Sequence, residues 1–119
     1  MEIKAAIACL SALAHENRLA TFRMLVQAGP QGLAAGEIAR RLDAPPNTLS
    51  ANLKVLTHAG LLESRRDGRS IIYSARFDQM SELLGYLMED CCAGSPEICA
   101  PLVEVLARTA CCVPEPLHA

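Results

Sequence analysis

The stretch that decides the fold is residues 35–74, which read AGEIARRLDAPPNTLSANLKVLTHAGLLESRRDGRSIIYS. A short segment at about 35–43 has Ile38 and Leu42 at helical spacing. After Pro45-Pro46-Asn47, residues 48–58 carry leucines that line one side of a second helix. Two short helices separated by a tight polar turn are the minimum helix-turn-helix, so we expect that motif here.

The residues directly after the second helix predict a basic β-hairpin. Leu61-Leu62-Glu63 and residues 70–74 are rich in apolar and β-branched side chains, and Asp67-Gly68 lies between them. Asp-Gly between two strand-like runs is a strong hairpin signal. Because the expected hairpin tip carries three arginines and follows a helix-turn-helix, we interpret it as a wing.

The flanking segments add further helices. Residues 2–14 show apolar side chains at helical spacing, and a second helix is expected to be capped by Asn17. Residues 77–90 form a longer amphipathic helix, and Ser95-Pro96 is a good start for a short C-terminal one. The expected fold is therefore mainly α with a β-hairpin, a winged helix-turn-helix in the order α-α-α-α-β-β-α plus a short C-terminal helix.

Length and composition suit one small helical domain. The chain has 119 residues, of which 51 % are hydrophobic and 3 % aromatic, so its core must be modest and largely aliphatic. No stretch approaches the ~20 apolar residues of a membrane span, and the N-terminus lacks the features of a signal peptide. We therefore expect a cytoplasmic protein with no membrane partner.

Charge is unevenly distributed along the chain. The net charge is −2, but residues 40–76 contain seven basic residues and three acidic ones, so this stretch carries +4 and the rest −6. A local basic surface on an acidic body fits a protein that touches phosphates with one face only.

The second helix of the pair begins with short polar side chains and one cation, which can reach base edges and phosphates from the major groove. Hairpin arginines suit adjacent backbone or minor-groove contacts. The alternative is an ordinary solvated helix and loop, but the order of the elements favours double-stranded DNA as the partner. The candidate DNA-binding residues are Asn47, Thr48, Ser50, Asn52, Lys54, Arg65, Arg66 and Arg69.

A helix-turn-helix protein that reads a palindromic or pseudo-palindromic operator does so as a dimer. The apolar faces of the helices at 2–14 and 77–90 are candidate homodimer surfaces. The alternative is that they fill the monomer core, and the two roles are only partly exclusive. We expect residues 1–92 to form the DNA-binding and dimerisation domain. Residues 93–119 are expected to form a cysteine-containing helix and tail, within the same domain or as a flexible extension.

Several motifs occur in a family-specific order between residues 10 and 75. They are Leu13-Ala14 to Arg18-Leu19, Ile38-Ala39, PNTLSxxLKVLxxAGLL from residue 46 and RRxGRxxxY from residue 65. In this order and spacing the chain resembles the ArsR/SmtB family of metalloregulatory repressors. The resemblance implies a winged-helix homodimer that represses its own resistance operon until a metal or metalloid releases it. Many relatives have Phe-His or Gln-His at Ala51-Asn52, so base preferences do not carry over.

Cysteine is concentrated in the tail. Of the six cysteines, Cys9 lies near the N-terminus, on the edge of a helix where packing is its expected role. The other five lie in the last 29 residues. A disulfide framework is not expected inside a cell. The tail cysteines are Cys91, Cys92, Cys99, Cys111 and Cys112.

Two other inducer sites of the family lack their ligands here, because residues 36–40 contain no thiol and residues 77–90 contain no histidine. Residues 90–99 resemble the family's C-terminal arsenic-binding variant, which implies Cys91, Cys92 and Cys99 as ligands of arsenite. Trivalent arsenic is thiophilic and prefers three thiolates, and soft sulfur ligands select soft ions. Cys111 and Cys112 are either an accessory thiol pair or part of a frayed tail. The alternative for the three ligands is that they are small buried hydrophobes.

Other functions remain open at this point. The same fold could use its thiols as a redox sensor, and methylarsenite, which needs two thiols, or antimonite could be the inducer. A metal-buffering protein without DNA function is disfavoured by the wing. A small thiol enzyme is disfavoured too, because there is no Cys-x-x-Cys and the histidines at 15, 58 and 118 are badly placed. We therefore expect no enzymatic activity and no catalytic cofactor.

Overall fold

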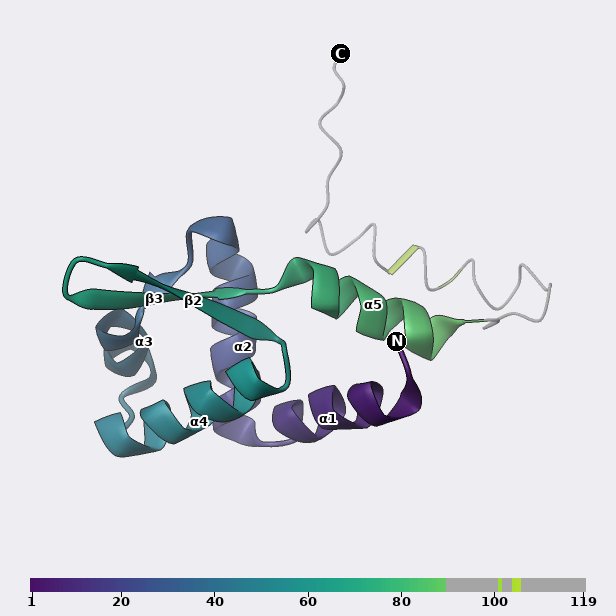
Figure 1. The fold of residues 1–119 in the computed structure, drawn as a ribbon, viewed down its shortest axis with the longest axis horizontal. Helices are drawn as coiled ribbons and strands as arrows, with labels where there is room; N and C mark the ends of the chain where they lie inside the picture. Colours follow the sequence, from purple (N-terminus) through teal and green to yellow (C-terminus); the bar gives the residue numbers. More distant parts are fainter. Residues whose placement is uncertain (90–100, 102–103, 106–119) are drawn as a thin grey trace, which may run out of the picture. The chain divides into compact units, whose positions relative to one another are not determined.

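The computed structural model describes residues 1–89, 101 and 104–105 (Figure 1). Contacts within the chain separate a unit of residues Met1–Tyr86 from residues Leu87–Ala119. The expected C-terminal helix falls almost entirely outside the described residues. The elements in chain order are α1 (Ile3–Leu13), α2 (Glu16–Ala28), the short 3-10 helix η1 (Gly29–Gln31), β1 (Leu33–Ala34), α3 (Ala35–Leu42), α4 (Pro46–His58), β2 (Leu62–Asp67), β3 (Ser70–Ala75) and α5 (Phe77–Met88).

The helix-turn-helix is formed by α3 and α4, as expected. The helix α3 ends at Asp43, which adopts the left-handed conformation with φ 52° and donates its backbone N–H to the Ala39 carbonyl. Aspartate tolerates this conformation better than most side chains. Pro45 is then extended, and Pro46 occupies the first turn of α4, where its missing N–H costs nothing. The turn between the helices is therefore fixed by Asp43 and by the two prolines.

The wing is an antiparallel hairpin of β2 and β3, and Figure 1 shows the two strands side by side. Asp67 pairs with Ser70, so the loop residues are Gly68 and Arg69 rather than the expected Asp-Gly pair. Gly68 has φ +65° and Arg69 does not have a positive φ, a pattern that matches a two-residue turn with glycine in first place. The strand β2 is also longer than expected, because Arg65 and Arg66 belong to it and not to the tip.

A third strand was not expected from the sequence. The two residues of β1 pair with β3, so the sheet order is β1-β3-β2. Gly32 leads into β1 with φ +71°, and a β-carbon at this position would collide with the Tyr73 carbonyl. Glycine therefore permits the close approach that attaches the wing to the helical part of the domain.

The expectation that Asn17 caps the second helix is wrong. The helix α2 begins at Glu16, and His15 is the N-cap, with extended backbone angles. The Nδ1 atom of His15 accepts the backbone N–H of Asn17 at 3.2 Å. The imidazole supplies the acceptor that a short polar side chain usually provides, so one of the free N–H groups of the first turn is satisfied.

The core lies between the helices and the sheet. On α1 the buried residues are Ala6, Cys9 and Ala12, and Cys9 is fully buried, as expected for a packing role. The larger side chains on α1 point outward: Ile3, Ile7 and Leu10 are 60 %, 57 % and 42 % exposed. The rest of the buried apolar set is Phe22, Leu25, Ile38, Leu49, Leu53, Leu56, Leu61, Leu62, Ala75 and Leu83.

Candidate DNA-binding surface

The outward face of α4 carries most of the polar side chains that the sequence singled out. Leu49, Leu53 and Leu56 are buried and fix the opposite face of this helix in the core. Four of the predicted DNA-binding residues are exposed as a result: Asn47, Thr48, Ser50 and Lys54. These side chains are available to a partner that approaches α4 from outside.

Asn52 is the exception, and the prediction that it lies on the DNA-facing surface of α4 is wrong. It is 7 % exposed and belongs to the inner face of α4. Asn52 is three residues after Leu49 and four before Leu56, and residues at these spacings lie on the same side of a helix. This arithmetic is available from the sequence, but the polar character of the side chain suggested the surface instead.

The three wing arginines are exposed, but they are held differently. Arg65 and Arg66 are neighbours on β2 and therefore point to opposite faces of the sheet. The Arg65 Nη2 donates to the Gln31 carbonyl at 3.0 Å, which ties the hairpin to the segment before β1. Arg69 lies in the loop between β2 and β3. Of these three side chains, the Arg66 and Arg69 guanidinium groups form no hydrogen bond to another described residue.

Part of the basic stretch is neutralised by acids on either side of it. Arg40 and Arg41 both bond to Glu37 on α3, with 2.7 Å between Arg41 Nε and Glu37 Oε2. These bonds, chiefly that from Arg40, lower the pKa of Glu37 to about 2. Arg76 pairs with Asp78 at 2.8 Å, which raises the pKa of Arg76 and lowers that of Asp78. Within residues 1–89, the cations of the stretch that form no ion pair are Lys54, Arg65, Arg66 and Arg69.

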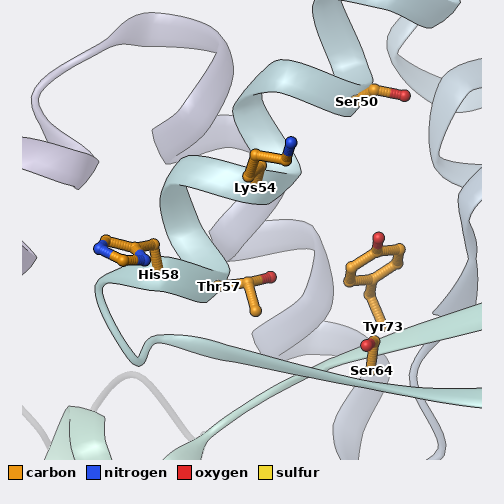
Figure 2. A pocket seen from close by; sticks show the side chains of 6 residues that line it. All are labelled: Ser50, Lys54, Thr57, His58, Ser64 and Tyr73. Carbon is orange, nitrogen blue, oxygen red and sulfur yellow. The ribbon is translucent and has the colours of Figure 1, made fainter.

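A pocket of about 380 Å³ lies between α4 and the wing strands (Figure 2). Two of the predicted residues line it, Ser50 and Lys54, and the sequence reasoning missed the other four: Thr57, His58, Ser64 and Tyr73. Two signals could have found them. Ser50, Lys54 and Thr57 follow the helical spacing of four and then three residues, and Ser64 and Tyr73 are direct partners in the hairpin.

The predicted arsenic ligands and accessory thiols, Cys91, Cys92, Cys99, Cys111 and Cys112, lie outside the described residues. Of the described part, Cys9 is the one cysteine, and its Sγ donates to the Ala59 carbonyl at 3.5 Å. In that same part of the chain, no group of three or more potential metal ligands comes together. Among the described helices, none is long and apolar enough to cross a membrane.

Comparison with known proteins agrees with this geometry. A family model described as a helix-turn-helix domain matches residues 13–65. The HTH-type transcriptional regulator YgaV of Escherichia coli (strain K12) is 31 % identical over 87 residues, which cover 73 % of this chain and 86 % of that protein. The homodimeric winged helix-turn-helix DNA-binding domain of Mb0332 from Mycobacterium bovis, a possible ArsR-family regulator, is 26 % identical with a TM-score of 0.61, covering 74 % of this chain and 82 % of that one. The chain belongs to the ArsR/SmtB family of winged-helix transcriptional regulators.

Another relative of this ArsR/SmtB-family regulator is the putative arsenical resistance operon repressor ArsR of Halobacterium salinarum. It is 39 % identical over 67 residues, which cover 56 % of this chain and 51 % of that protein. These relatives are transcriptional regulators and not enzymes. The ArsR/SmtB-family regulator described here is likewise a transcriptional regulator with a helix-turn-helix DNA-binding domain, and it is not an enzyme.

Proposed function

We propose that the protein is a homodimeric repressor that binds a palindromic or pseudo-palindromic operator and releases it when trivalent arsenic binds cysteine thiolates. The observation that carries the DNA-binding part is the outward face of α4, where Asn47, Ser50 and Lys54 are exposed beside a wing with unpaired arginines. The helix reads base edges from the major groove, and the wing contacts the backbone or minor groove.

The dimer is supported by an apolar face that the core leaves exposed. Ile3, Ile7 and Leu10 lie on one side of α1, and Leu84 on α5 is 50 % exposed. Monomeric proteins rarely leave several large aliphatic side chains together in water. The solved relative from Mycobacterium bovis is described as homodimeric. A dimer that buries this face holds two copies of α4 at a fixed spacing, as a two-fold symmetric operator requires.

The proposed inducer site consists of Cys91, Cys92 and Cys99, which follow α5 in the sequence. Three thiols match the preference of trivalent arsenic, and the Halobacterium salinarum relative is named for arsenical resistance. Cys9 is not proposed as a ligand, because it is fully buried and its thiol is already bonded to Ala59. Cys111 and Cys112 stay accessory candidates.

Release requires a link between these thiols and α4. Within the described unit, Gln79 of α5 supplies one, since its Nε2 donates to the Ala59 carbonyl at the end of α4 at 3.4 Å. The same Nε2 also lies 3.5 Å from the Cys9 Sγ on α1. A coupling free energy of about 1–3 kcal/mol is typical of linked sites and lowers DNA affinity about 5- to 150-fold.

The test measures binding to the DNA upstream of the protein's own gene, with and without arsenite. Wild type and Cys9→Ala should both release the DNA, whereas Cys91→Ser, Cys92→Ser and Cys99→Ser should keep it bound. Release from all three serine variants contradicts the proposed ligands. Peroxide, methylarsenite and antimonite are tested in parallel, and release by peroxide alone supports a redox-sensing repressor of the same fold.

A further inference from the structure

We propose that the pocket between α4 and the wing is a binding site for one backbone phosphate of the bound DNA strand. This inference rests on the proposed DNA binding and adds to it a site that reads no bases. It assigns a role to Thr57, Ser64 and Tyr73, which the sequence did not point to. For Ser50 and Lys54, which were expected to reach base edges or phosphates, it selects the phosphate.

The hydrogen-bond donors come from α4 and from the two wing strands that face it. Ser50, Lys54 and Thr57 form a stripe on one side of α4, and Ser64 and Tyr73 are paired across β2 and β3. Figure 2 shows the Thr57 hydroxyl directed toward the Tyr73 side of the pocket, with the Tyr73 ring on the far side. Four hydroxyls and one ammonium group therefore surround the same space.

The charge of the lining selects an anion. None of the six lining residues is acidic, and Lys54 contributes a full positive charge. His58 lies at the edge with its ring turned away from Tyr73 (Figure 2). Hydroxyl and ammonium donors around an acid-free pocket suit an oxygen-rich anion, because hydrogen bonds to a charged acceptor are stronger than those to a neutral one.

One hydroxyl of the pocket has no hydrogen-bond partner. Within the described residues, Thr57 Oγ1 is buried without a hydrogen-bond partner. A buried polar group without a partner reduces the stability of the fold. An acceptor that enters the pocket offers this hydroxyl the partner that the described residues do not provide, and the Ser64 and Tyr73 hydroxyls can donate to the same acceptor.

A DNA phosphate is favoured over a free ion by the position of the pocket. It is bounded on one side by the outward stripe of α4 and on the other by the wing, which are the two parts expected to contact the duplex. A DNA strand that passes from the helix to the wing must cross the space between them. Phosphate contacts of this kind fix the register of a protein on DNA without reading sequence.

The first experiment measures the Kd of Tyr73→Phe and Lys54→Gln for two duplexes, the protein's own upstream DNA and a shuffled sequence, over a series of salt concentrations. Tyr73→Phe should raise Kd about fivefold on both duplexes with an unchanged salt slope, because it removes a hydrogen bond and no charge. Lys54→Gln should raise Kd on both and lower the slope of log K against log salt by about one.

Thr57→Val separates a binding role from a structural one. Valine keeps the shape of the side chain and removes the unpartnered hydroxyl, so the melting temperature should stay unchanged or rise. The Kd for both duplexes should nevertheless rise about threefold. Opposite directions for stability and affinity are not expected of a residue that only supports the fold. Tyr86→Phe and Ser81→Ala on α5 are matched controls and should leave both quantities unchanged.

A neutral phosphate analogue locates the contact. Replacing single phosphates by methylphosphonate should weaken wild-type binding at one position in each half-site, and Tyr73→Phe should lose nothing more at that position. An unchanged Kd for Tyr73→Phe, or a loss of affinity confined to the protein's own upstream duplex, overturns the proposed phosphate-binding site. If orthophosphate shifts the Tyr73 NMR signals but the variant binds DNA normally, the pocket takes a free ion only. If wild type binds neither duplex, the proposed function itself fails.

Discussion

Single residues decide where the backbone of this domain turns. Gly32 and Asp43 both have a positive φ, but they are constrained differently. At Gly32 a side chain would meet the backbone of Tyr73, whereas at Asp43 the constraint is the left-handed conformation that ends α3. The sequence alone does not identify the conformation of either residue. At Gly32 the collision arises only once β1 pairs with β3, and at Asp43 the left-handed conformation arises only where α3 ends.

Gly32→Ala should therefore destabilise the protein by at least about 2 kcal/mol, from the positive φ and from the collision with Tyr73. The free energy of unfolding in urea measures this effect. Gly36→Ala is the matched control, because this helical glycine has open space around its α-carbon, and it should stabilise by about 0.5–1 kcal/mol. A neutral Gly32→Ala would mean that β1 does not approach β3 as described.

The Glu37 carboxylate should titrate with a pKa of about 2, below its usual value of 4.5, because Arg40 and Arg41 bond to it. A lowered pKa in the folded state stabilises the protein above pH 4.5, and this contribution is lost as the pH falls from 4.5 toward 2. The Glu37 side chain is partly exposed, so added salt should weaken the shift. NMR titration of the Glu37 side chain measures the pKa. In Arg40→Gln/Arg41→Gln it should return toward 4.5.

At the scale of elements, periodicity in the sequence predicts the helices and the hairpin but not their inner faces. The apolar spacing of Ile3, Ile7 and Leu10 predicts a helix, yet α1 buries Ala6, Cys9 and Ala12 instead. The small residues of α1 therefore face the core, and Ile3, Ile7 and Leu10 are left outside. The strand β1 is missed because two residues carry no periodicity. Asn52 is misplaced because side-chain polarity outweighed its helical position.

The exposed side of α1 supports a specific prediction about assembly. Ile7→Glu places a charge on the apolar face, so it should shift a homodimer toward monomer and weaken operator binding at least tenfold, as the second α4 is lost. Sedimentation velocity gives the mass, and fluorescence anisotropy gives the Kd. Ala8→Glu adds the same charge at an exposed neighbouring position that points to another side of α1, and it should remain dimeric. A dimeric Ile7→Glu variant would exclude this face.

For the whole molecule, the proposed release by arsenite requires that α5 communicates with α4, and the Gln79 side chain forms a hydrogen bond between α5 and the Ala59 carbonyl at the end of α4. Gln79→Ala should leave the Kd for DNA within about twofold of wild type and reduce the arsenite-dependent change in Kd. The same anisotropy titration with and without arsenite measures both quantities. Ser81→Ala is the control on the same helix and should respond as wild type. A full arsenite response in Gln79→Ala would place the link elsewhere.

In the proposed complex, a dimer presents two copies of α4 and two wings to one operator. A hydroxyl-radical footprint on the DNA upstream of the protein's own gene tests this arrangement. We expect two protected segments related by two-fold symmetry, with centres about one helical turn apart or a multiple of it, and with further protection where the wings lie. A single protected segment, or no protection at a protein concentration that saturates binding, would rule out a dimer that binds one operator through two copies of α4.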